Sequence, residues 1–476
     1  MKTTTNKNAY ISATAIFMLS YVIIVAVAYC KYFLFGSFDG VVTSEFYVAL
    51  AGCAISTLLI LVSLITYLIY SRSKLIEKTK KLLAICTSLI FTYALCIVTS
   101  SLNLYYMPVA FVAFVVAPLA DRRDSFITNI TTNLIVACVL LFESIIGSKV
   151  DTLTVVVMMI TGIFIGSIAS YTLSNVTRRF MYVMRGLCIS AVTFGLLFVS
   201  SYILRAINFM EIVGFVCLVS FAQPIVGLIL QPIFESLFNI ITNTKLMEFT
   251  DNNSPLMKRL IAEALGTYNH SMSVASFAEV CAMRIGENPY LAKACAYYHD
   301  VGKINNPRYF SENQSGSNPH DELLPEVSAG ILRKHATDGF DLCQKYRIPI
   351  EIAHVTNQHH GTLPMAVFYN KATKLTDGEV DIREYSYQGP RPVTKIAAII
   401  MICDASEAAL RAKGKPTPTE VDAIVTSIIN DRIARKQFDN CEITMQDLNV
   451  IKKTIIEQYG GLYHERVQYP DGKVIK

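Results

Sequence analysis

Two patterns of hydrophobic and polar positions divide the chain. From residue 11 to about residue 237, apolar residues form successive runs, each close to the roughly 20 residues that cross a bilayer as a helix. The runs predict eight membrane spans, with the bounds 11–34, 46–70, 82–100, 103–120, 126–147, 153–174, 184–204 and 209–232. Because only Ser100-Ser101-Leu102-Asn103 separates the third run from the fourth, a re-entrant hairpin is the alternative for that pair.

The basic residues test this count, because cytoplasmic loops of membrane proteins carry an excess of Lys and Arg. They gather before the first span, between the second and third, and after the fourth, sixth and eighth: Lys2, Lys7, Arg72, Lys74, Lys78, Lys80, Lys81, Arg122, Arg123, Arg178, Arg179 and Lys245. Among basic residues, the alternate loops hold a single Lys149 and a single Arg205, and the first loop carries the acidic Asp39 and Glu45. Both termini are therefore predicted to be cytoplasmic.

Two further features of the apolar half bear on function. The first run is longer than the apolar part of a signal peptide and lacks a small-x-small cleavage site, so it is predicted to remain as a span. Glu143 lies near the outer end of the fifth span, where a carboxylate can reach water, and we expect a structural or interfacial role for it. With no convincing buried charge and no inverted repeat, the sequence does not favour a transporter.

The second half has the spacing of amphipathic helices with short loops. These are predicted at 255–264, 269–285, 289–300, 322–337, 339–346, 349–359, 393–412, 418–436 and 445–458, with a small hairpin at 364–388. Ser254 can cap the first of them, with Pro255 in its first position. The predicted fold is all-α: a polytopic membrane domain over 1–237, a linker over 238–254 and a cytoplasmic helical domain over 255–476.

Composition agrees with a membrane protein that works in a reducing compartment. Hydrophobic residues make up 53% of the 476 residues, more than a soluble chain of this length usually has. The net charge of +5 gives no case for binding a DNA or RNA polymer. The twelve cysteines are scattered, without a CxxC pair, and are interpreted as free thiols.

The candidate chemistry lies in the second half, where imidazoles and carboxylates recur at predicted helix ends. His299 and Asp300 stand together at the end of one helix, with Gly302 placed to stop it. Asp404 falls within an otherwise apolar stretch, where a buried carboxylate needs a cation or a strong hydrogen-bond partner. Neutral imidazoles and carboxylates are ligands for borderline divalent metals. The candidate ligands are His270, His299, Asp300, His335, His359, His360 and Asp404.

The order of these residues resembles the HD-domain superfamily of metal-dependent phosphohydrolases. More narrowly, the chain is similar to the seven-transmembrane HD family of bacterial cyclic di-AMP phosphodiesterases, the PgpH type. The matching motifs are Gly266-Thr267-Tyr268-Asn269-His270-Ser271, Tyr298-His299-Asp300-Val301-Gly302-Lys303, Glu312-Asn313-Gln314, Asn318-Pro319-His320-Asp321, Lys334-His335, Gln358-His359-His360-Gly361-Thr362, Asp404 with Glu407 and Arg411, and His464-Glu465-Arg466 with Tyr469-Pro470. They run in full order through about 245–476.

The resemblance implies a site with two divalent metal ions, of iron or manganese. It assigns His270, His299, Asp300 and Asp404 to the first metal. His335, His359 and His360 go to the second, with Asp300 as the bridge. It further implies hydrolysis of cyclic di-AMP to the linear dinucleotide pApA, in the inner membrane of a bacterial cell. Hydrolysis of another nucleotide such as cyclic di-GMP, or nucleotide binding without turnover, are the alternatives.

Several residues near these motifs have more than one interpretation. Lys303 is a candidate catalytic residue that contacts phosphate, as the resemblance suggests, or a solvated charge at a helix end. Arg411 is expected to form a surface salt bridge, and His320, His354 and His464 are expected to be structural. The chain departs from the family in two ways. Only residues 36–45 or so separate its first two spans, where a large extracellular domain is usual, and the residue types at four positions differ from those usual in the family: Leu265, Asn269, Gln388 and Ile396.

Overall fold

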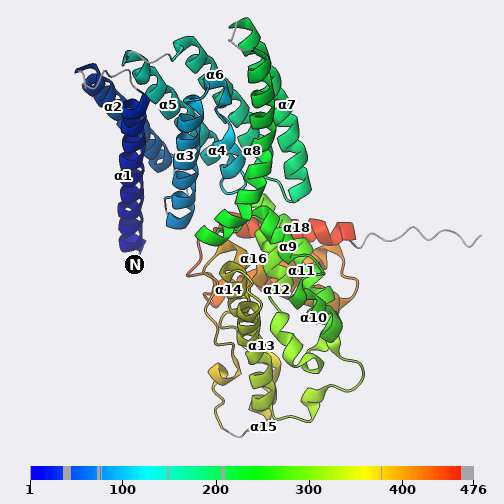
Figure 1. Ribbon diagram of the computed structural model, residues 1–476. Helices are drawn as coiled ribbons and strands as arrows, with labels where there is room; N and C mark the ends of the chain where they lie inside the picture. Colours follow the sequence, from blue (N-terminus) through cyan, green and yellow to red (C-terminus); the bar gives the residue numbers. More distant parts are fainter. Residues whose placement is uncertain are drawn as a thin grey trace, which may run out of the picture. The chain divides into compact units, whose positions relative to one another are not determined.

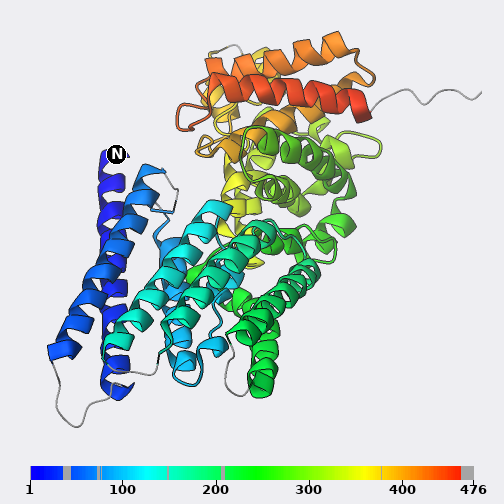
Figure 2. The same ribbon diagram turned by 90° about the horizontal axis from the view of Figure 1, so that it is seen from above.

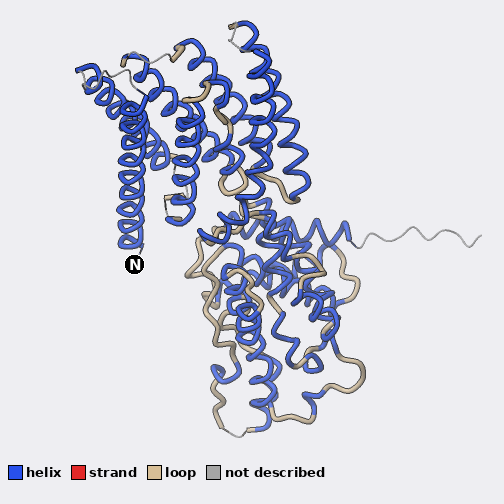
Figure 3. Tube along the Cα trace, viewed as in Figure 1, coloured by secondary structure: helices blue, strands red, loops and turns tan. Residues whose placement is uncertain are grey.

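The computed structural model describes residues 2–35, 44–71, 75–76, 78–146, 150–204, 209–376 and 378–462. It divides into two units, Met1–Thr244 and Lys245–Lys476. The predicted all-α class is confirmed, because helices and loops account for the described residues apart from one isolated antiparallel bridge between Pro364 and Ser386 (Figure 3). Several residues used in the charge argument and in the last motif lie outside the described ranges: Asp39, Arg72, Lys74, Lys149, Arg205 and 464–470.

The first unit holds seven helices that are long and apolar enough to cross a membrane. They are α1 (Lys2–Phe35), α2 (Ser44–Tyr70), α3 (Thr79–Ser100), α5 (Arg122–Ile145), α6 (Thr152–Leu173), α7 (Arg179–Ile203) and α8 (Phe209–Phe238). Figures 1 and 2 show α1 beside α2 at one edge of this unit. The prediction of eight helical spans is therefore wrong by one.

The fourth predicted span, 103–120, is a broken segment. It contains only a single 3-10 turn, η1 (Leu104–Tyr106), and a short helix, α4 (Phe111–Val116). Every residue of α4 is buried within the bundle. The run is apolar because it packs against protein on all sides, and Pro108 interrupts it where a continuous helix would need a backbone N–H. The re-entrant hairpin is not formed either, since α3 is a full-length helix.

This broken segment still returns the chain through the bundle. Lys31, near the end of α1, lies 2.6 Å from the Ser101 hydroxyl after α3 and 3.5 Å from the Glu143 carboxylate near the end of α5. Helices α1, α3 and α5 thus end at one level and run parallel. A chain that leaves α3 at this level must cross back before α5 begins, and the broken segment makes that return.

The same contact corrects the expectation that Glu143 reaches water. Its side chain is 3% exposed and that of Lys31 is 4% exposed. Because an isolated charge is costly at such a depth, each of the two charges compensates the other. Glu143 has a structural role, which joins α5 to α1.

The second unit is a bundle of helices around the central helix α11 (Leu265–Arg284). This helix packs against α12 (Pro289–Tyr298), α16 (Lys395–Lys413) and α18 (Met445–Leu462). A second layer is formed by α13 (Pro325–Lys345), which packs on α14 (Ile350–Gln358) and α15 (Ala366–Leu375). The remaining helices are α9 (Asn243–Phe249), α10 (Pro255–Glu263) and α17 (Pro418–Ala434), and the α12–α13 connection contains short 3-10 turns. The two helices predicted at 322–337 and 339–346 are one helix, α13.

The predicted hairpin at 364–388 is wrong except for one isolated antiparallel bridge between Pro364 and Ser386. Residues Ala366–Leu375 form helix α15, and Asp377 of the expected turn lies outside the described residues. The reason is visible in the spacing of Met365, Phe368 and Ala372, which fits one face of a helix better than alternate positions of a strand. These three side chains pack together in a buried cluster with Ala329 of α13 and Tyr385.

Candidate metal centre

Five helices bring the seven candidate ligands to one place in the second unit. His270 lies in α11, His335 in α13 and Asp404 in α16, while the other four follow the ends of α12 and α14. Each sequence-predicted ligand position takes part: His270, His299, Asp300, His335, His359, His360 and Asp404. The ends of α12 and α14 matter because a residue at a helix terminus can turn its side chain toward a neighbouring helix.

The local sequence fixes the end of α12. The Asn288 side chain accepts hydrogen bonds from the backbone N–H groups of Tyr290 and Leu291, which caps the start of the helix. The helix ends at Tyr298, and a 3-10 turn over Val301–Asn305 follows. Gly302 lies in that turn, and a Cβ there would overlap the carbonyl oxygen of His335. The glycine is needed for close approach to α13, rather than for stopping the helix as the sequence suggested.

The first group of ligands consists of His270, His299, Asp300 and Asp404, with ligand atoms within 4.8 Å of one another. Nε2 of His270 lies 3.0 Å from Oδ1 of Asp404 and 3.6 Å from Oδ2 of Asp300. Nε2 of His299 lies 3.2 Å from the same Asp300 oxygen. Two imidazole nitrogens and two carboxylates therefore face a common point.

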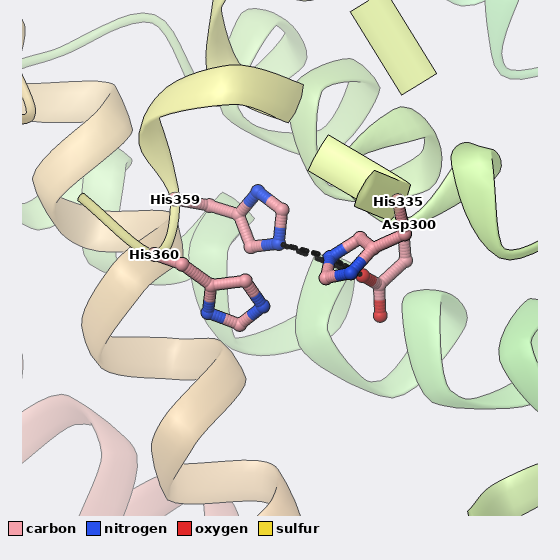
Figure 4. A group of neighbouring side chains, drawn as sticks. All are labelled: Asp300, His335, His359 and His360. Atoms are coloured by element: carbon pink, nitrogen blue, oxygen red, sulfur yellow. Dashed lines mark hydrogen bonds and ion pairs between the residues drawn. The ribbon is translucent and has the colours of Figure 1, made fainter. Parts of the chain in front are cut away.

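The second group consists of Asp300, His335, His359 and His360 (Figure 4). Oδ1 of Asp300 lies 3.3 Å from Nε2 of His335 and 3.5 Å from Nε2 of His359. The ring of His360 stacks on Tyr387, with centroids 4.2 Å apart. Asp300 thus presents Oδ2 to the first group and Oδ1 to the second, which is the geometry of a bridging carboxylate.

The donor atoms of Asp300 and His299 are buried and have unfilled hydrogen-bonding capacity, which fits a pair of cations. Both carboxylate oxygens of Asp300 and Nε2 of His299 are buried without a hydrogen bond of regular geometry among the described residues, although the ammonium of Lys303 lies 2.6 Å from Oδ2 of Asp300. Asp300 is 1% exposed, a depth at which an uncompensated carboxylate is costly. Imidazole nitrogens with carboxylate oxygens suit Zn, Fe and Mn alike, so the donor set fits two divalent metal ions without naming the element.

Backbone carbonyls orient three of the imidazoles. The Nδ1 atoms of His299, His335 and His359 donate to the carbonyl oxygens of Ala296, Leu332 and Thr356, at 2.7, 2.5 and 2.8 Å. These hydrogen bonds occupy Nδ1 and leave Nε2 of each ring as the atom that faces Asp300. Each imidazole is thereby held in the orientation that a metal requires.

Burial and neighbouring charges perturb the pKa values of the centre in a consistent way. Burial lowers the pKa of His359 and holds that of His360 well below its usual value, so both rings are neutral. For Asp300, burial raises the pKa, but His299 and Lys303 lower it by more and keep the carboxyl ionised. For His299, burial opposes protonation, yet Asp300 raises its pKa to about 10. The carboxylates thus attract positive charge, and a bound metal would displace the proton that His299 carries.

Lys303 is buried beside the ligands. Its Nζ lies 2.6 Å from Oδ2 of Asp300 and 2.8 Å from Oε1 of Glu312, and it sits over the ring of Phe310. The side chain is 12% exposed, so the interpretation as a solvated helix-end charge is wrong. Burial alone would lower the pKa of Lys303, but the two carboxylates have the larger effect. The pKa therefore lies above its usual value, and the side chain stays cationic.

The ligands open onto a cleft of about 420 Å³. Its lining combines Lys303, Tyr387 and Arg411 with five of the seven ligand candidates: His270, His335, His359, His360 and Asp404. Arg411 forms the salt bridge expected of it, 3.3 Å from Oε1 of Glu407. Nε2 of His320 donates a hydrogen bond to the Tyr309 carbonyl oxygen at 2.9 Å, and His354 packs on Phe340. Neither of these two histidines belongs to the two ligand groups.

The sequence analysis missed the role of Glu407. Its Oε2 lies 2.5 Å from Nδ1 of His270, on the side of the ring away from Asp404. The signal was present, because Glu407 follows Asp404 by three residues on one face of a helix whose other residues are mostly buried. The motif contained the residue, but spacing alone did not pair it with a histidine 137 positions earlier.

Comparisons with known proteins agree with this architecture. The model of the 7TM receptor with intracellular HD hydrolase matches residues 47–242, and the HD domain model matches residues 267–409. The chain is 35% identical over 374 residues to the cyclic-di-AMP phosphodiesterase PgpH of Listeria monocytogenes, covering 78% of this chain and 51% of that protein. It is 39% identical over 252 residues to PgpH of Bacillus subtilis, covering 53% and 35%. The chain therefore spans about half of the length of the first relative and about a third of the length of the second.

The second unit also resembles a solved domain. The crystal structure of the Listeria monocytogenes phosphodiesterase PgpH HD domain is 43% identical and covers 44% of this chain and 100% of that one, with a TM-score of 0.43. A second structure of that domain, in complex with cyclic-di-AMP, is 44% identical and covers 45% and 100%, also with a TM-score of 0.43. With both family models matched in order, the chain belongs to the seven-transmembrane receptors with an intracellular HD hydrolase domain, the family of the PgpH cyclic-di-AMP phosphodiesterases.

Proposed function

We propose that this multi-pass membrane protein is a metal-dependent phosphodiesterase that hydrolyses cyclic di-AMP to linear pApA in the bacterial cytoplasm. The observation that carries the proposal is the set of seven ligand candidates in two groups that share Asp300. Such a set is suited to hydrolysis, because a protein that only binds a nucleotide has no need of two cations across one carboxylate. The cyclic-di-AMP bound to a domain 44% identical to this one supports the choice of substrate.

In this proposal, His270, His299, Asp300 and Asp404 hold one divalent metal, and Asp300, His335, His359 and His360 hold the other. Two metals, of iron or manganese, supply Lewis-acid activation of water and of the phosphoryl oxygens. The protein residues fix the geometry: Asp300 sets the separation of the two positions, and the imidazoles are aligned by their Nδ1 hydrogen bonds. Asp300, just after the end of α12, thus contributes to both positions at once.

The reaction adds one water across one phosphodiester of the ring. An oxygen of water forms a bond to phosphorus, the bond from phosphorus to the ribose 3′ oxygen breaks, and that oxygen takes a proton. The product keeps a 5′-phosphate and a free 3′-hydroxyl. Lys303 is proposed as a catalytic residue, because its buried ammonium lies in the cleft wall and adds positive charge beside the phosphate.

The test is turnover by the purified full-length chain in detergent, loaded with Mn²⁺ and supplied with cyclic di-AMP or cyclic di-GMP. We expect pApA to form from cyclic di-AMP and to disappear in an Asp404→Asn variant. An Arg284→Gln variant serves as the control, since Arg284 pairs with Glu457 and does not line the cleft. If the metal-loaded protein binds the nucleotide without cleaving it, the proposal of an enzyme is refuted and the protein is a receptor. If it cleaves cyclic di-GMP faster than cyclic di-AMP, cyclic di-GMP replaces cyclic di-AMP as the substrate.

A further inference from the structure

His270 differs from three of the other candidate histidine ligands in the partner of its Nδ1 atom. The Nδ1 atoms of His299, His335 and His359 face backbone carbonyls, whereas Nδ1 of His270 faces the carboxylate of Glu407 at 2.5 Å. The Glu407 side chain is 10% exposed, and that of His270 is 3% exposed. A carboxylate, whose other oxygen pairs with Arg411 at 3.3 Å, thus lies behind one ligand of the first group.

A carboxylate behind a metal-binding imidazole acts on the metal through that ring. It fixes the ring orientation and the tautomer, and it raises the basicity of the nitrogen that faces the metal. A neutral carbonyl fixes the tautomer as well, but it adds less charge. The first group therefore gains electrostatic stabilisation for a cation that the second group does not receive.

The direct ligands add to this difference. The first group contains two carboxylates, Asp300 and Asp404, whereas the second contains only the shared Asp300 and three neutral imidazoles. In addition, His360 of the second group is 22% exposed, more than any other ligand candidate. The number of carboxylates and the burial of the ligands favour a cation in the first position, and the ammonium of Lys303, 2.6 Å from Oδ2 of Asp300, opposes only part of this effect.

We propose that Glu407 is a positioning residue that acts through His270 and makes the first metal position the tighter of the two. The second position then exchanges its ion more readily and governs how the enzyme responds to the metal supply. This inference rests on the proposed dinuclear site, but it concerns metal affinity and not the identity of the substrate.

The test counts Mn²⁺ bound by the metal-stripped full-length chain in detergent, with the free ion followed by electron paramagnetic resonance. The wild type should show two classes of site. Glu407→Gln keeps the shape of the side chain and removes its charge, so it should weaken the tighter class by about 10–100-fold, the usual effect of losing such a partner, and leave the weaker class unchanged. Glu407→Asp keeps the charge but moves it from the ring, and should fall between the two.

Two controls separate this effect from others. Arg411→Gln tests whether the charge of Glu407 acts through its second partner, 3.3 Å away, and should leave the tighter class unchanged. Glu279→Gln removes a carboxylate from the helix that carries His270, where it pairs with Lys293 at 2.9 Å outside the cleft, and should also have no effect. Circular dichroism of each metal-free variant checks that it is folded.

Three results would overturn the inference: an unchanged tighter class in folded Glu407→Gln, an equal loss in Arg411→Gln, or fewer than two sites in the wild type. Should Glu407→Gln fail to fold, Glu407→Asp takes its place, and an unchanged tighter class in folded Glu407→Asp would overturn the inference. A wild type that binds two Mn²⁺ with the expected order but cleaves no cyclic dinucleotide would refute the proposed function and leave the role of Glu407 standing.

Discussion

The buried position of Lys303 predicts a metal-dependent stability defect when its charge is removed. In the metal-free protein, Lys303→Met leaves Asp300 and Glu312 without the ammonium that lies 2.6 and 2.8 Å from them. These carboxylates are 1% and 8% exposed, so solvent does little to replace the lost partner. Breaking a buried pair in this way costs about 3–5 kcal/mol. For a unit of this size, that corresponds to a fall in Tm of roughly 6–20 °C.

The assay is thermal unfolding of a fragment spanning residues 245–476, followed by far-ultraviolet circular dichroism, because the chain contains no Trp to report by fluorescence. Melting in a chelator should show the full defect. Added Mn²⁺ should reduce it, because two cations at Asp300 replace the missing charge there.

A matched control is Lys293→Met. Lys293 pairs with Glu279 at a similar distance, 2.9 Å, but the two side chains are 26% and 33% exposed. Solvent-accessible pairs of this kind contribute about 0–1 kcal/mol. The reasoning is refuted if Lys303→Met melts in chelator within about 2 °C of the wild type, or if Lys293→Met is destabilised as much.

Two other changes test the packing that supports the site and the bundle. Lys31→Met should destabilise the detergent-solubilised full chain by about 3–5 kcal/mol, and adding Glu143→Leu to it should restore most of that loss. Thermal unfolding measures both effects, and losses that add up in the double variant would contradict the prediction. Gly302→Ala should cost about 1–3 kcal/mol of stability, because the added Cβ would overlap the His335 carbonyl, and it should lower Mn²⁺ binding at the second position. Equilibrium dialysis measures the binding, and two fully occupied sites in a variant of unchanged Tm would contradict the prediction.

The ligand groups could be anticipated from the sequence because each ligand belongs to a motif whose order is specific. His299-Asp300 at the end of an amphipathic run, and Asp404 in an apolar helix, carry their own physical signal. What the sequence lacked was the partner of each ring. The contact between His270 and Glu407 depends on how α11 packs against α16, and no spacing rule joins residues so far apart.

The membrane half shows a different limit. Hydropathy predicted a helical span at 103–120, and the segment is indeed buried, but as a broken chain with only α4 in helical form. An apolar run reports that its side chains avoid water. It does not report whether they face lipid or protein, and this ambiguity produced the count of eight helices.

The central claim is that Asp300 joins two metal positions, and its loss should empty both. The measurement is the number of Mn²⁺ ions retained per chain by purified Asp300→Asn and by the wild type, after dialysis against metal-free buffer, with circular dichroism to show that both are folded. Two ions in the wild type and almost none in the variant is the predicted result. A folded Asp300→Asn protein that retains one ion as tightly as the wild type would contradict the bridge.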